Sequence, residues 1–336
     1  MTSLILAAVL LGDANPVLKG LDPIDLSNGL EISGFPQFTA RLGRHIYRFS
    51  SLENLNKFSS DPYRYGVMNG GACGKMGPMS GHGSPDRWSV VDGRIYLFAS
   101  EGCRTTFLNN LADYQPRQLK TIATTAREVK DGQGVFDQAI AAHGGKKAVS
   151  AIRTAEWDLT IPYKEGGKDK IWHTKGGWYG RDQLAIWQEW DAGISFFFRD
   201  RQVSREGKPG AVFVTHPSER RELTKEVLRH PAAILLDGRE SVVKSAGKNA
   251  FLISKEGIQL HVRLDAKTNL IEGVGFEDLY QGRYSKVEVN FSGYRNFKGI
   301  QFPMSFQTTV NGTTGKVQTY ASLKLNAAKP KFFSER

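Results

Sequence analysis

The sequence contains very little cysteine and no long apolar run. Only Cys73 and Cys103 carry thiols among 336 residues, so a scaffold held by several disulfides is excluded, whereas one bridge or one metal site is not. No apolar stretch reaches the ~20 residues that a membrane-spanning helix needs, and we expect no transmembrane segment. A hydrophobic content of 40% with 24% charged residues is instead typical of a globular protein with real cores.

Recognisable catalytic motifs are also missing. The chain contains no G-x-S-x-G nucleophile elbow, no H-E-x-x-H helix and no G-x-x-x-x-G-K phosphate loop. The histidines after residue 134 stand apart from one another, and we expect them to be surface or hydrogen-bonded side chains: His143, His173, His216, His230 and His261. The sequence therefore predicts a binding protein rather than an enzyme.

The charge balance is basic but dispersed. Lys and Arg number 45 against 34 Asp and Glu, a formal net charge of +11. These cations are spread through strand-like segments instead of forming one stripe or tail, so we expect no nucleic-acid partner. Association with an anionic membrane surface stays open.

The first 14 residues resemble an export signal. An apolar run from Leu4 to Leu11 is followed by Gly12-Asp13-Ala14, a small-x-small cleavage pattern. We therefore predict a signal peptide over residues 1–14 and a periplasmic or otherwise exported protein. Because no Lys or Arg precedes the apolar run, a buried first strand or a misplaced start codon is the alternative.

Two segments repeat each other after this leader. They read GRHIYRFSSLENLNKFSSDPYRY and GRIYLFASEGCRTTFLNNLADY, with an offset of 49 residues between Tyr47 and Tyr96. The alternating aromatic residues of each copy predict a strand, and Ser51 or Ser100 is placed to cap a short helix. Each copy is thus expected to form a strand, a cap and a helix.

The region around these repeats resembles the YHS family. The matching pieces are LKGLDPIDL, FTARLGRHIYRFSSLENLNKFSSDPYRYG, GGACG and DRWSVVDGRIYLF, which cover residues 17 to 114. The resemblance implies a small α+β module over residues 16–115, related to the metal-binding treble-clef group. The paired cysteines of that group are not complete here, because Asn54 stands where the second copy has Cys103.

The rest of the chain has a different pattern. Residues 116–134 are polar and are expected to form a linker, with a helix in its middle as an alternative. Residues 135–336 predict a helix, a turn at Gly144-Gly145, a second helix, and then a strand meander with one helical insertion. LDAKTNLIEG, GYRNFKGIQFP and LNAAKPKFFSE resemble the lipoprotein-sorting carrier superfamily. The resemblance implies an antiparallel, curved β half-barrel around a hydrophobic cavity.

The stretch GGACGKMGPMSGHG concentrates soft donors. Cys73, Met76, Met79 and His82 are spaced by three residues, and with Cys103 they form a candidate metal site. Thiolate, thioether and imidazole donors favour copper, whereas zinc would use Cys73, Cys103 and His82. The alternative is an irregular glycine-rich loop with packed methionines, and cysteines that are buried or joined in a disulfide.

Aromatic residues concentrate in the first strands of the second domain. On a half-barrel they would form the wall of a ligand cavity; ordinary core packing is the alternative. The candidate wall consists of Trp157, Trp172, Trp178, Trp187, Trp190 and Phe197.

The combined expectation is an exported two-domain α+β binding protein. It would bind copper, or alternatively zinc, through the first module and a lipid or other apolar ligand through the second. The competing interpretation is a structural or assembly protein of the cell envelope, with Cys73 and Cys103 buried or disulfide-bonded and no metal.

Overall fold

The computed structural model describes residues 15–327 except 79, 116, 118–121, 179–183, 190–193, 200–201, 207–211, 215, 229 and 256. The side chains of some further residues between 172 and 239 are also outside the description. The chain divides into two compact units. Unit 1 contains the residues up to Gln115, with Val212–Glu222 and Leu279–Tyr284, and unit 2 contains Pro116–Ala211, Leu223–Asp278 and the residues from Ser285. The predicted signal peptide, residues 1–14, lies outside the described residues.

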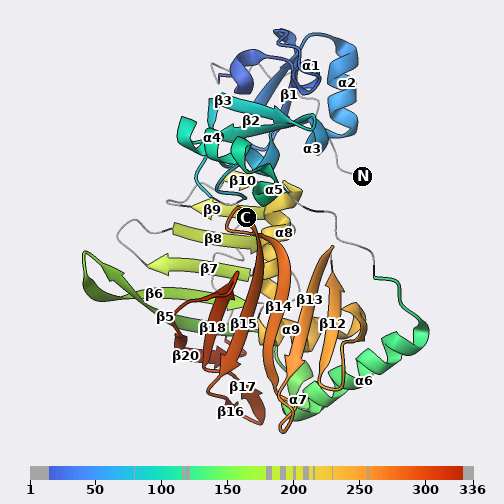
Figure 1. Cartoon of the computed structure of the whole chain (residues 1–336), viewed down its shortest axis with the longest axis vertical. Coiled ribbons are helices and arrows are strands. Elements are labelled where there is room, and N and C mark those ends of the chain that lie inside the picture. The colour runs from blue at the N-terminus through green and yellow to red at the C-terminus, as the bar shows by residue number, and fades with distance from the viewer. Residues whose placement is uncertain are drawn as a thin grey trace. The chain divides into compact units, whose positions relative to one another are not determined.

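Unit 1 is built from two similar halves (Figure 1). The first half contains η1 (Val17–Gly20), α1 (Pro23–Ser27), β1 (Phe35–Leu42), β2 (His45–Phe49), α2 (Leu52–Ser60) and α3 (Pro62–Tyr65). The second contains η2 (Met68–Gly71), β3 (Ser84–Val91), β4 (Arg94–Phe98), α4 (Glu101–Asn109) and α5 (Leu111–Tyr114). In each half the two strands form an antiparallel hairpin.

The predicted order of strand, cap and helix is confirmed in both halves. The hydroxyl of Ser51 accepts the backbone N–H of Asn54, and the hydroxyl of Ser100 accepts that of Cys103, both at 3.1 Å. These bonds satisfy N–H groups that the first turn of a helix leaves without a partner. The serine of each repeat therefore determines where its helix begins.

The aromatic residues of the repeats form equivalent core clusters. The ring of Phe58 lies 4.9 Å from that of Tyr47 and 5.0 Å from that of Phe49. In the second half, the ring of Phe107 lies 4.8 Å from Tyr96 and 5.2 Å from Phe98. Each helix thus packs on its hairpin through one buried phenylalanine.

Unit 2 is mainly antiparallel sheet. Its helices are α6 (Ala126–Ala142), α7 (Gly145–Ser150), α8 (Pro217–Leu228, whose first residues belong to unit 1), α9 (Pro231–Asp237) and η3 (Arg239–Ser241). Its first strands are β5 (Ala155–Glu165), β6 (Lys168–Trp178), β7 (Leu184–Glu189), β8 (Ile194–Arg199) and β9 (Gln202–Glu206); β10 (Val212–Val214) falls in unit 1. The later strands are β11 (Val242–Ser245), β12 (Ala250–Lys255), β13 (Ile258–Leu264), β14 (Ile271–Tyr280), β15 (Arg283–Ser292), β16 (Arg295–Phe297), β17 (Ile300–Phe302), β18 (Ser305–Val310), β19 (Thr313–Thr314) and β20 (Gln318–Leu325).

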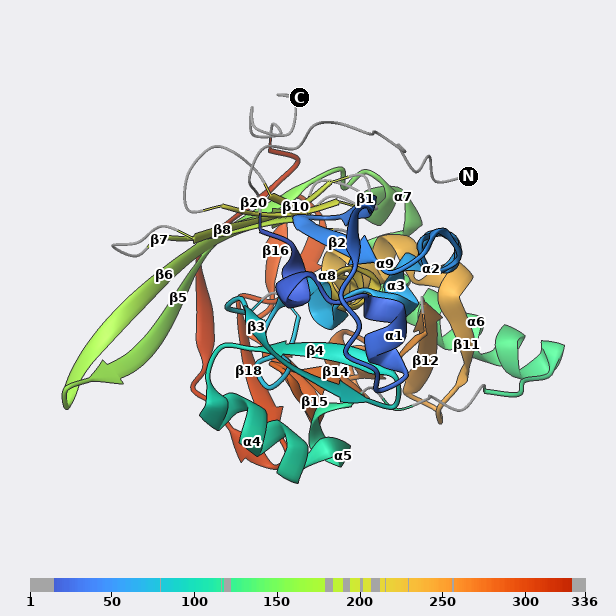
Figure 2. The same ribbon diagram turned by 90° about the horizontal axis from the view of Figure 1, so that it is seen from above.

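The sheet of unit 2 joins the first and last strands of the domain. Its order is β9-β8-β7-β6-β5-β20-β18-β15-β14-β13-β12-β11. Along β13, buried and partly exposed residues alternate without interruption, as expected for a strand with one face in the core. Figures 1 and 2 show the sheet curving around α9, whose residues Ala232–Leu235 are at most 3% exposed. The helical insertion therefore occupies the inner side of the curved sheet, and the expected α+β fold is confirmed at this level.

Helix α6 begins inside the predicted linker. Thr125 and Glu128 form a reciprocal capping box, in which each side chain accepts the backbone N–H of the other residue. This pair starts the helix at Ala126, nine residues before the expected position at 135. The predicted turn at Gly144-Gly145 then separates α6 from α7, and both glycines have positive φ.

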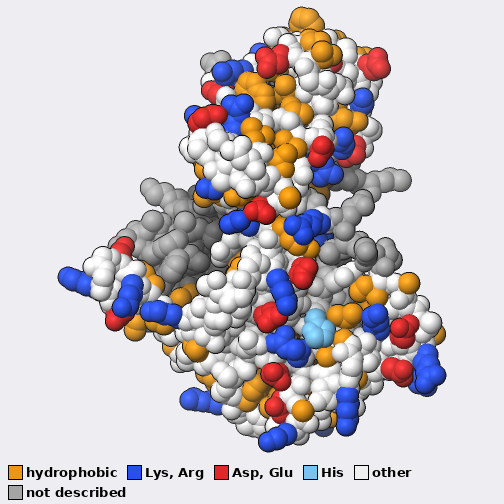
Figure 3. All heavy atoms as spheres, in the orientation of Figure 1, with side chains coloured by type: hydrophobic (Ala, Val, Ile, Leu, Met, Phe, Trp, Pro, Cys, Tyr) orange, Lys and Arg blue, Asp and Glu red, His pale blue; other side chains and the backbone are white. Residues whose placement is uncertain are grey.

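The described surface mixes both signs of charge. On the face shown in Figure 3, Lys and Arg side chains lie among Asp and Glu side chains and do not merge into one continuous basic area. Among the described residues, no helix has both the length and the apolar character needed to cross a membrane.

Candidate functional site

Of the predicted metal-binding residues, Cys73, Met76 and His82 lie between η2 and β3, and Cys103 lies in α4. Cys73 is completely buried after η2, and Cys103 is partly exposed in the first turn of α4. The Cys103 side chain packs against the buried cluster that contains Cys73, and both thiols are free. The structure therefore places the two cysteines next to each other, as both the metal and the disulfide alternatives require.

The other predicted donors do not complete a metal site. Met76 is 44% exposed and His82 is also exposed; Met79 lies outside the described residues. Within the described part of the chain, no group of three His, Cys, Asp or Glu side chains is arranged to hold a metal ion. The two neighbouring thiols are thus consistent with the copper and zinc expectations. Among the described His, Cys, Asp and Glu side chains, none joins them as a third donor.

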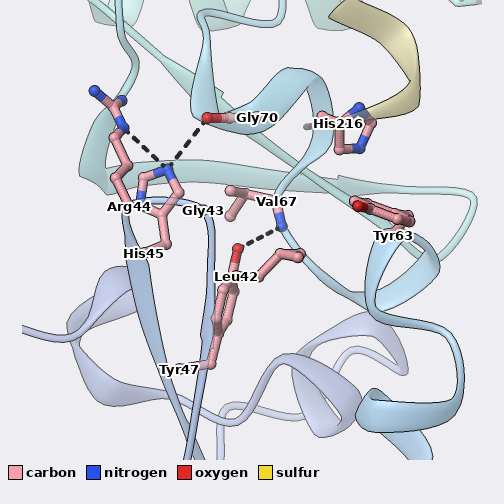
Figure 4. Close-up of a pocket in the computed structure, with 9 residues that line it drawn as sticks. All are labelled: Leu42, Gly43, Arg44, His45, Tyr47, Tyr63, Val67, Gly70 and His216. Atoms are coloured by element: carbon pink, nitrogen blue, oxygen red, sulfur yellow. Dashed lines mark hydrogen bonds between the residues drawn. The ribbon is translucent and has the colours of Figure 1, made fainter. Parts of the chain in front are cut away.

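A small pocket lies in unit 1 beside β2 (Figure 4). Its lining includes His45, Tyr63 and His216, and its cavity volume is only ≈ 20 Å³, about the space of one water molecule. Burial, with a smaller contribution from the positive charge of Arg44, lowers the pKa of His45 to about 4. Nε2 of His45 lies 3.4 Å from Arg44 Nε and 3.3 Å from the carbonyl of Gly70.

This pocket is unsuited to an organic ligand. Because a neutral imidazole nitrogen either accepts or donates, Nε2 of His45 can bond the Arg44 donor or the Gly70 carbonyl, and not both. A Cβ at Gly71 would come within 2.2 Å of this nitrogen, so a glycine is needed here. The geometry is that of a satisfied, closely packed histidine.

The predicted aromatic wall in unit 2 is described through one side chain, Trp157. It is 8% exposed, and its indole lies against Gly176 of β6, where a Cβ would come within 2.6 Å of the ring. The absence of a side chain at Gly176 makes room for the indole. Trp157 also stacks on His230 with ring centroids 4.5 Å apart, so the helical insertion covers it.

The remaining residues of that wall are placed only by strand register. Trp172 pairs with Ile161 and Trp178 with Ala155, positions with the same alternation as Trp157. In contrast, Trp187 pairs with Lys175, which pairs with Asp158, and Phe197 follows the same alternation as Trp187. Trp190 lies outside the described residues. The register therefore divides the predicted wall between the two faces of the sheet.

His230 was not singled out by the sequence. It is buried between Trp157 and Phe302, whose ring centroid lies 5.4 Å away. Among the described residues, neither of its ring nitrogens has a hydrogen-bond partner, and burial lowers its pKa to about 3. The expectation of a surface or hydrogen-bonded histidine is wrong at this position, because an isolated histidine in a sequence carries no sign of what will cover it.

Comparison with known proteins gives a limited result. No family model and no curated protein matches the chain, so the YHS resemblance gains no support there. A DUF1329 family protein from Desulfovibrio piger is 13% identical with a TM-score of 0.40, covering 61% of this chain and 97% of its own. A LolA superfamily protein from Nitrosomonas europaea is 10% identical with a TM-score of 0.34, covering 61% and 98%.

A third solved structure is a putative outer membrane lipoprotein-sorting protein domain from Vibrio parahaemolyticus. It is 11% identical with a TM-score of 0.32, covering 61% of this chain and 96% of its own. Because the TM-scores are low, we base no functional argument on these structures.

Proposed function

We propose that unit 2 is a carrier-type module that binds an apolar, lipid-like ligand between its curved sheet and the helical insertion. The observation that carries this proposal is the contact of Trp157 with His230, where a buried imidazole has no hydrogen-bond partner among the described residues. The insertion, α8 and α9, acts as a cover that the ligand displaces. Export from the cytoplasm, expected from the apolar N-terminal run, is part of the proposal.

Burial has two opposite effects on the stability of the cover. Ala232, Ala233, Ile234 and Leu235 are buried and stabilise the closed form through the hydrophobic effect. Burial of His230 without hydrogen bonds costs about 1–3 kcal/mol. Displacement of α9 would return this imidazole to water and recover that cost.

A second polar contact anchors α8 in the same unit. Lys225 lies 3.6 Å from Asp278, and their side chains are only 2% and 6% exposed. For a buried ion pair the loss of hydration roughly offsets the attraction between the charges, so it contributes orientation more than net stability. The ion pair thus fixes the position of α8 and adds little net stability to the contact between the insertion and the sheet.

The chemistry of the contact selects the ligand class. The surfaces that separation of α9 from the sheet would expose are aliphatic side chains on the helix, the Trp157 indole and the Phe302 ring. A pocket with mostly apolar walls and one or two polar groups suits an acyl chain with a small polar end. His230, neutral above its low pKa, could donate one hydrogen bond to such a polar end and accept another.

The direct test is ligand binding by the full chain. A fluorescent fatty-acid analogue is titrated into the purified protein, and a solvent extract of protein prepared without detergent is analysed by mass spectrometry. We expect saturable binding of the probe and copurified lipid. His230→Phe should weaken probe binding, because an apolar ring stabilises the closed cover.

A matched control distinguishes the cover from the outer surface. Ile171 is 63% exposed on β6, and Ile171→Ala should leave probe affinity unchanged. Absence of both saturable binding and extracted lipid, or equal affinities for wild type and His230→Phe, would contradict the proposal.

A further inference from the structure

The two halves of unit 1 match in more than their hairpins and helices. Residues 18–20 have φ values of 59°, 55° and 82°, and residues 69–71 have 57°, 62° and 85°. After these left-handed turns, Leu21 forms an isolated antiparallel bridge with Ser33, as Ala72 does with His82. The loop that precedes each hairpin is therefore repeated as well, and its first part corresponds at an offset of 51 residues, from Leu21 to Ala72.

This correspondence makes Asp22 the counterpart of Cys73. The backbone N–H of Asp22 donates to the carbonyl of Ile32 at 2.8 Å, and that of Cys73 donates to the carbonyl of Gly81 at 2.9 Å. Asn54 and Cys103 are the matching residues of the two helices, each donating its N–H to the capping serine. Each half therefore brings one loop residue and one helix residue together, Asp22 with Asn54 in the first half and Cys73 with Cys103 in the second.

In the first half, a polar pair of side chains joins the loop to the helix. The Asp22 carboxylate accepts the side-chain amide of Asn54 at 2.8 Å and the backbone N–H of Ser50 at 2.7 Å. The second half places Cys73 and Cys103 there, and Cys103 packs against the buried cluster that contains Cys73. Both halves therefore link loop and helix through a side-chain pair, and only the second pair can become covalent.

The two thiols have unequal surroundings. Cys73 is 0% exposed, packed in the core of the second half with Tyr96, Phe98 and Phe107. Cys103 is partly exposed in the first turn of α4. The Ser100 hydroxyl, then the neighbouring Cys73 and the positive charge of Lys75, lower the pKa of the Cys103 thiol below its usual range, which raises its thiolate fraction near neutral pH.

We infer that Cys73 and Cys103 form a dithiol–disulfide redox site, in which Cys103 attacks a small disulfide and Cys73 resolves the product. The Cys103 thiolate bonds to one sulfur of the small disulfide and releases the other half as a thiolate, which takes up a proton. Cys73 then gives its proton to solvent and attacks the Cys103 sulfur, expelling the remaining half as a second thiol. The protein dithiol loses two electrons, and the small disulfide gains them.

The test uses the full chain, whose two cysteines make every thiol reading unambiguous. Reduced protein is exposed to 2-hydroxyethyl disulfide, quenched with acid and measured by intact mass. We expect wild type to lose two hydrogens and retain no adduct, and Cys73→Ala to keep one adduct on Cys103. Cys103→Ala should react at least about tenfold more slowly than Cys73→Ala, since its remaining thiol is buried.

Matched cap variants separate chemistry from folding. Ser100→Ala and Ser51→Ala each remove one helix cap, costing about 1 kcal/mol, and only the first removes a hydrogen bond to a thiol. Ser100→Ala should slow the reaction at pH 7, by up to about tenfold for a rise of one pKa unit, and Ser51→Ala should not. The inference is overturned if wild type retains a stable adduct, if the two cysteine variants react equally fast, or if both cap variants slow the reaction equally. The wild-type result stands even if a cysteine variant fails to fold.

Discussion

Two histidines are buried in unit 2 with very different surroundings. Nδ1 of His143 lies 2.7 Å from the carbonyl of Gln301, and its Nε2 accepts the backbone N–H of Ile271 at 3.1 Å. His230 is also buried, and within the part of the chain that the structure describes neither of its nitrogens has a partner. Burial lowers both pKa values, to about 4 for His143 and about 3 for His230.

Under the proposed function, His143 belongs to a permanent junction and His230 to a displaceable one. His143 ends α6 and joins it to β14 and β17, so its hydrogen bonds contribute to the scaffold of the unit. His230 precedes α9 on the inner side of the sheet and offers only ring contacts. Buried polar groups are almost always satisfied in folded proteins, and the proposed function accounts for the exception at His230 by a contact that opens when the ligand binds.

The largest expected effect is the loss of the His143 junction. His143→Phe would leave the Ile271 N–H and the Gln301 carbonyl buried without their partner, at about 1–3 kcal/mol each. We expect the free energy of unfolding to fall by about 2–5 kcal/mol, measured by urea denaturation followed by circular dichroism. A loss below about 0.5 kcal/mol, the range of ordinary surface substitutions, would mean that these bonds are not needed.

His230→Phe should act in the opposite direction. A phenyl ring keeps the stack on Trp157 and removes two unsatisfied nitrogens, so we expect a gain of about 1–2 kcal/mol in unfolding free energy. The same urea titration measures it. Destabilisation as large as that of His143→Phe would remove the distinction between the two regions.

The pH dependence sharpens the comparison further. Each histidine is neutral in the folded protein down to its lowered pKa and takes up a proton near pH 6.5 when unfolded. Stability from this source is therefore fully present above pH 6.5 and falls as the pH drops toward 4, by up to about 1.4 kcal/mol per pH unit and histidine.

His230→Phe should make the unfolding free energy depend less on pH between 6.5 and 4, because one fewer histidine takes up a proton on unfolding. Urea titrations of wild type and His230→Phe between pH 7 and 4 measure the difference, in which contributions common to both proteins cancel. Parallel curves would show that His230 is solvated and titrates normally in the folded state.

An exposed histidine gives the smallest expected effect. His173 on β6 has a side chain that is 51% exposed and lies 3.7 Å from Asp158. His173→Phe should change the unfolding free energy by no more than about 0.5 kcal/mol and leave probe binding unchanged. A larger change in the urea titration would mean that histidine replacement itself, rather than the buried surroundings, causes the effects above.

Local features of the fold were predictable because their signals are local. Ser51 and Ser100 marked the starts of their helices, and Gly144-Gly145 marked the turn after α6. The capping box of Thr125 and Glu128 was equally visible, yet it lies in a polar segment that composition alone assigns to a linker. The hydrogen bonds of this box start a helix there, although the polar composition of the segment is typical of a linker.

The sites depended on contacts that one sequence does not display. The repeat at an offset of 49 identified Asn54 as the counterpart of Cys103, but the match of Asp22 with Cys73 has an offset of 51, because the second loop is two residues shorter. The partner of Trp157 could not be anticipated either, since His230 is more than seventy positions away and reaches it only after the insertion folds back on the sheet.

Hydrogen exchange of the α9 amides measures the displaceable cover most directly. With the fatty-acid analogue bound, we expect faster exchange in Pro231–Asp237, while the amides of Ile258–Leu264 in β13 stay protected. His230→Phe should suppress the ligand-induced change. If α9 exchanges as slowly as β13 with and without the probe, the insertion is a fixed part of the core and the account of unit 2 as a carrier is wrong.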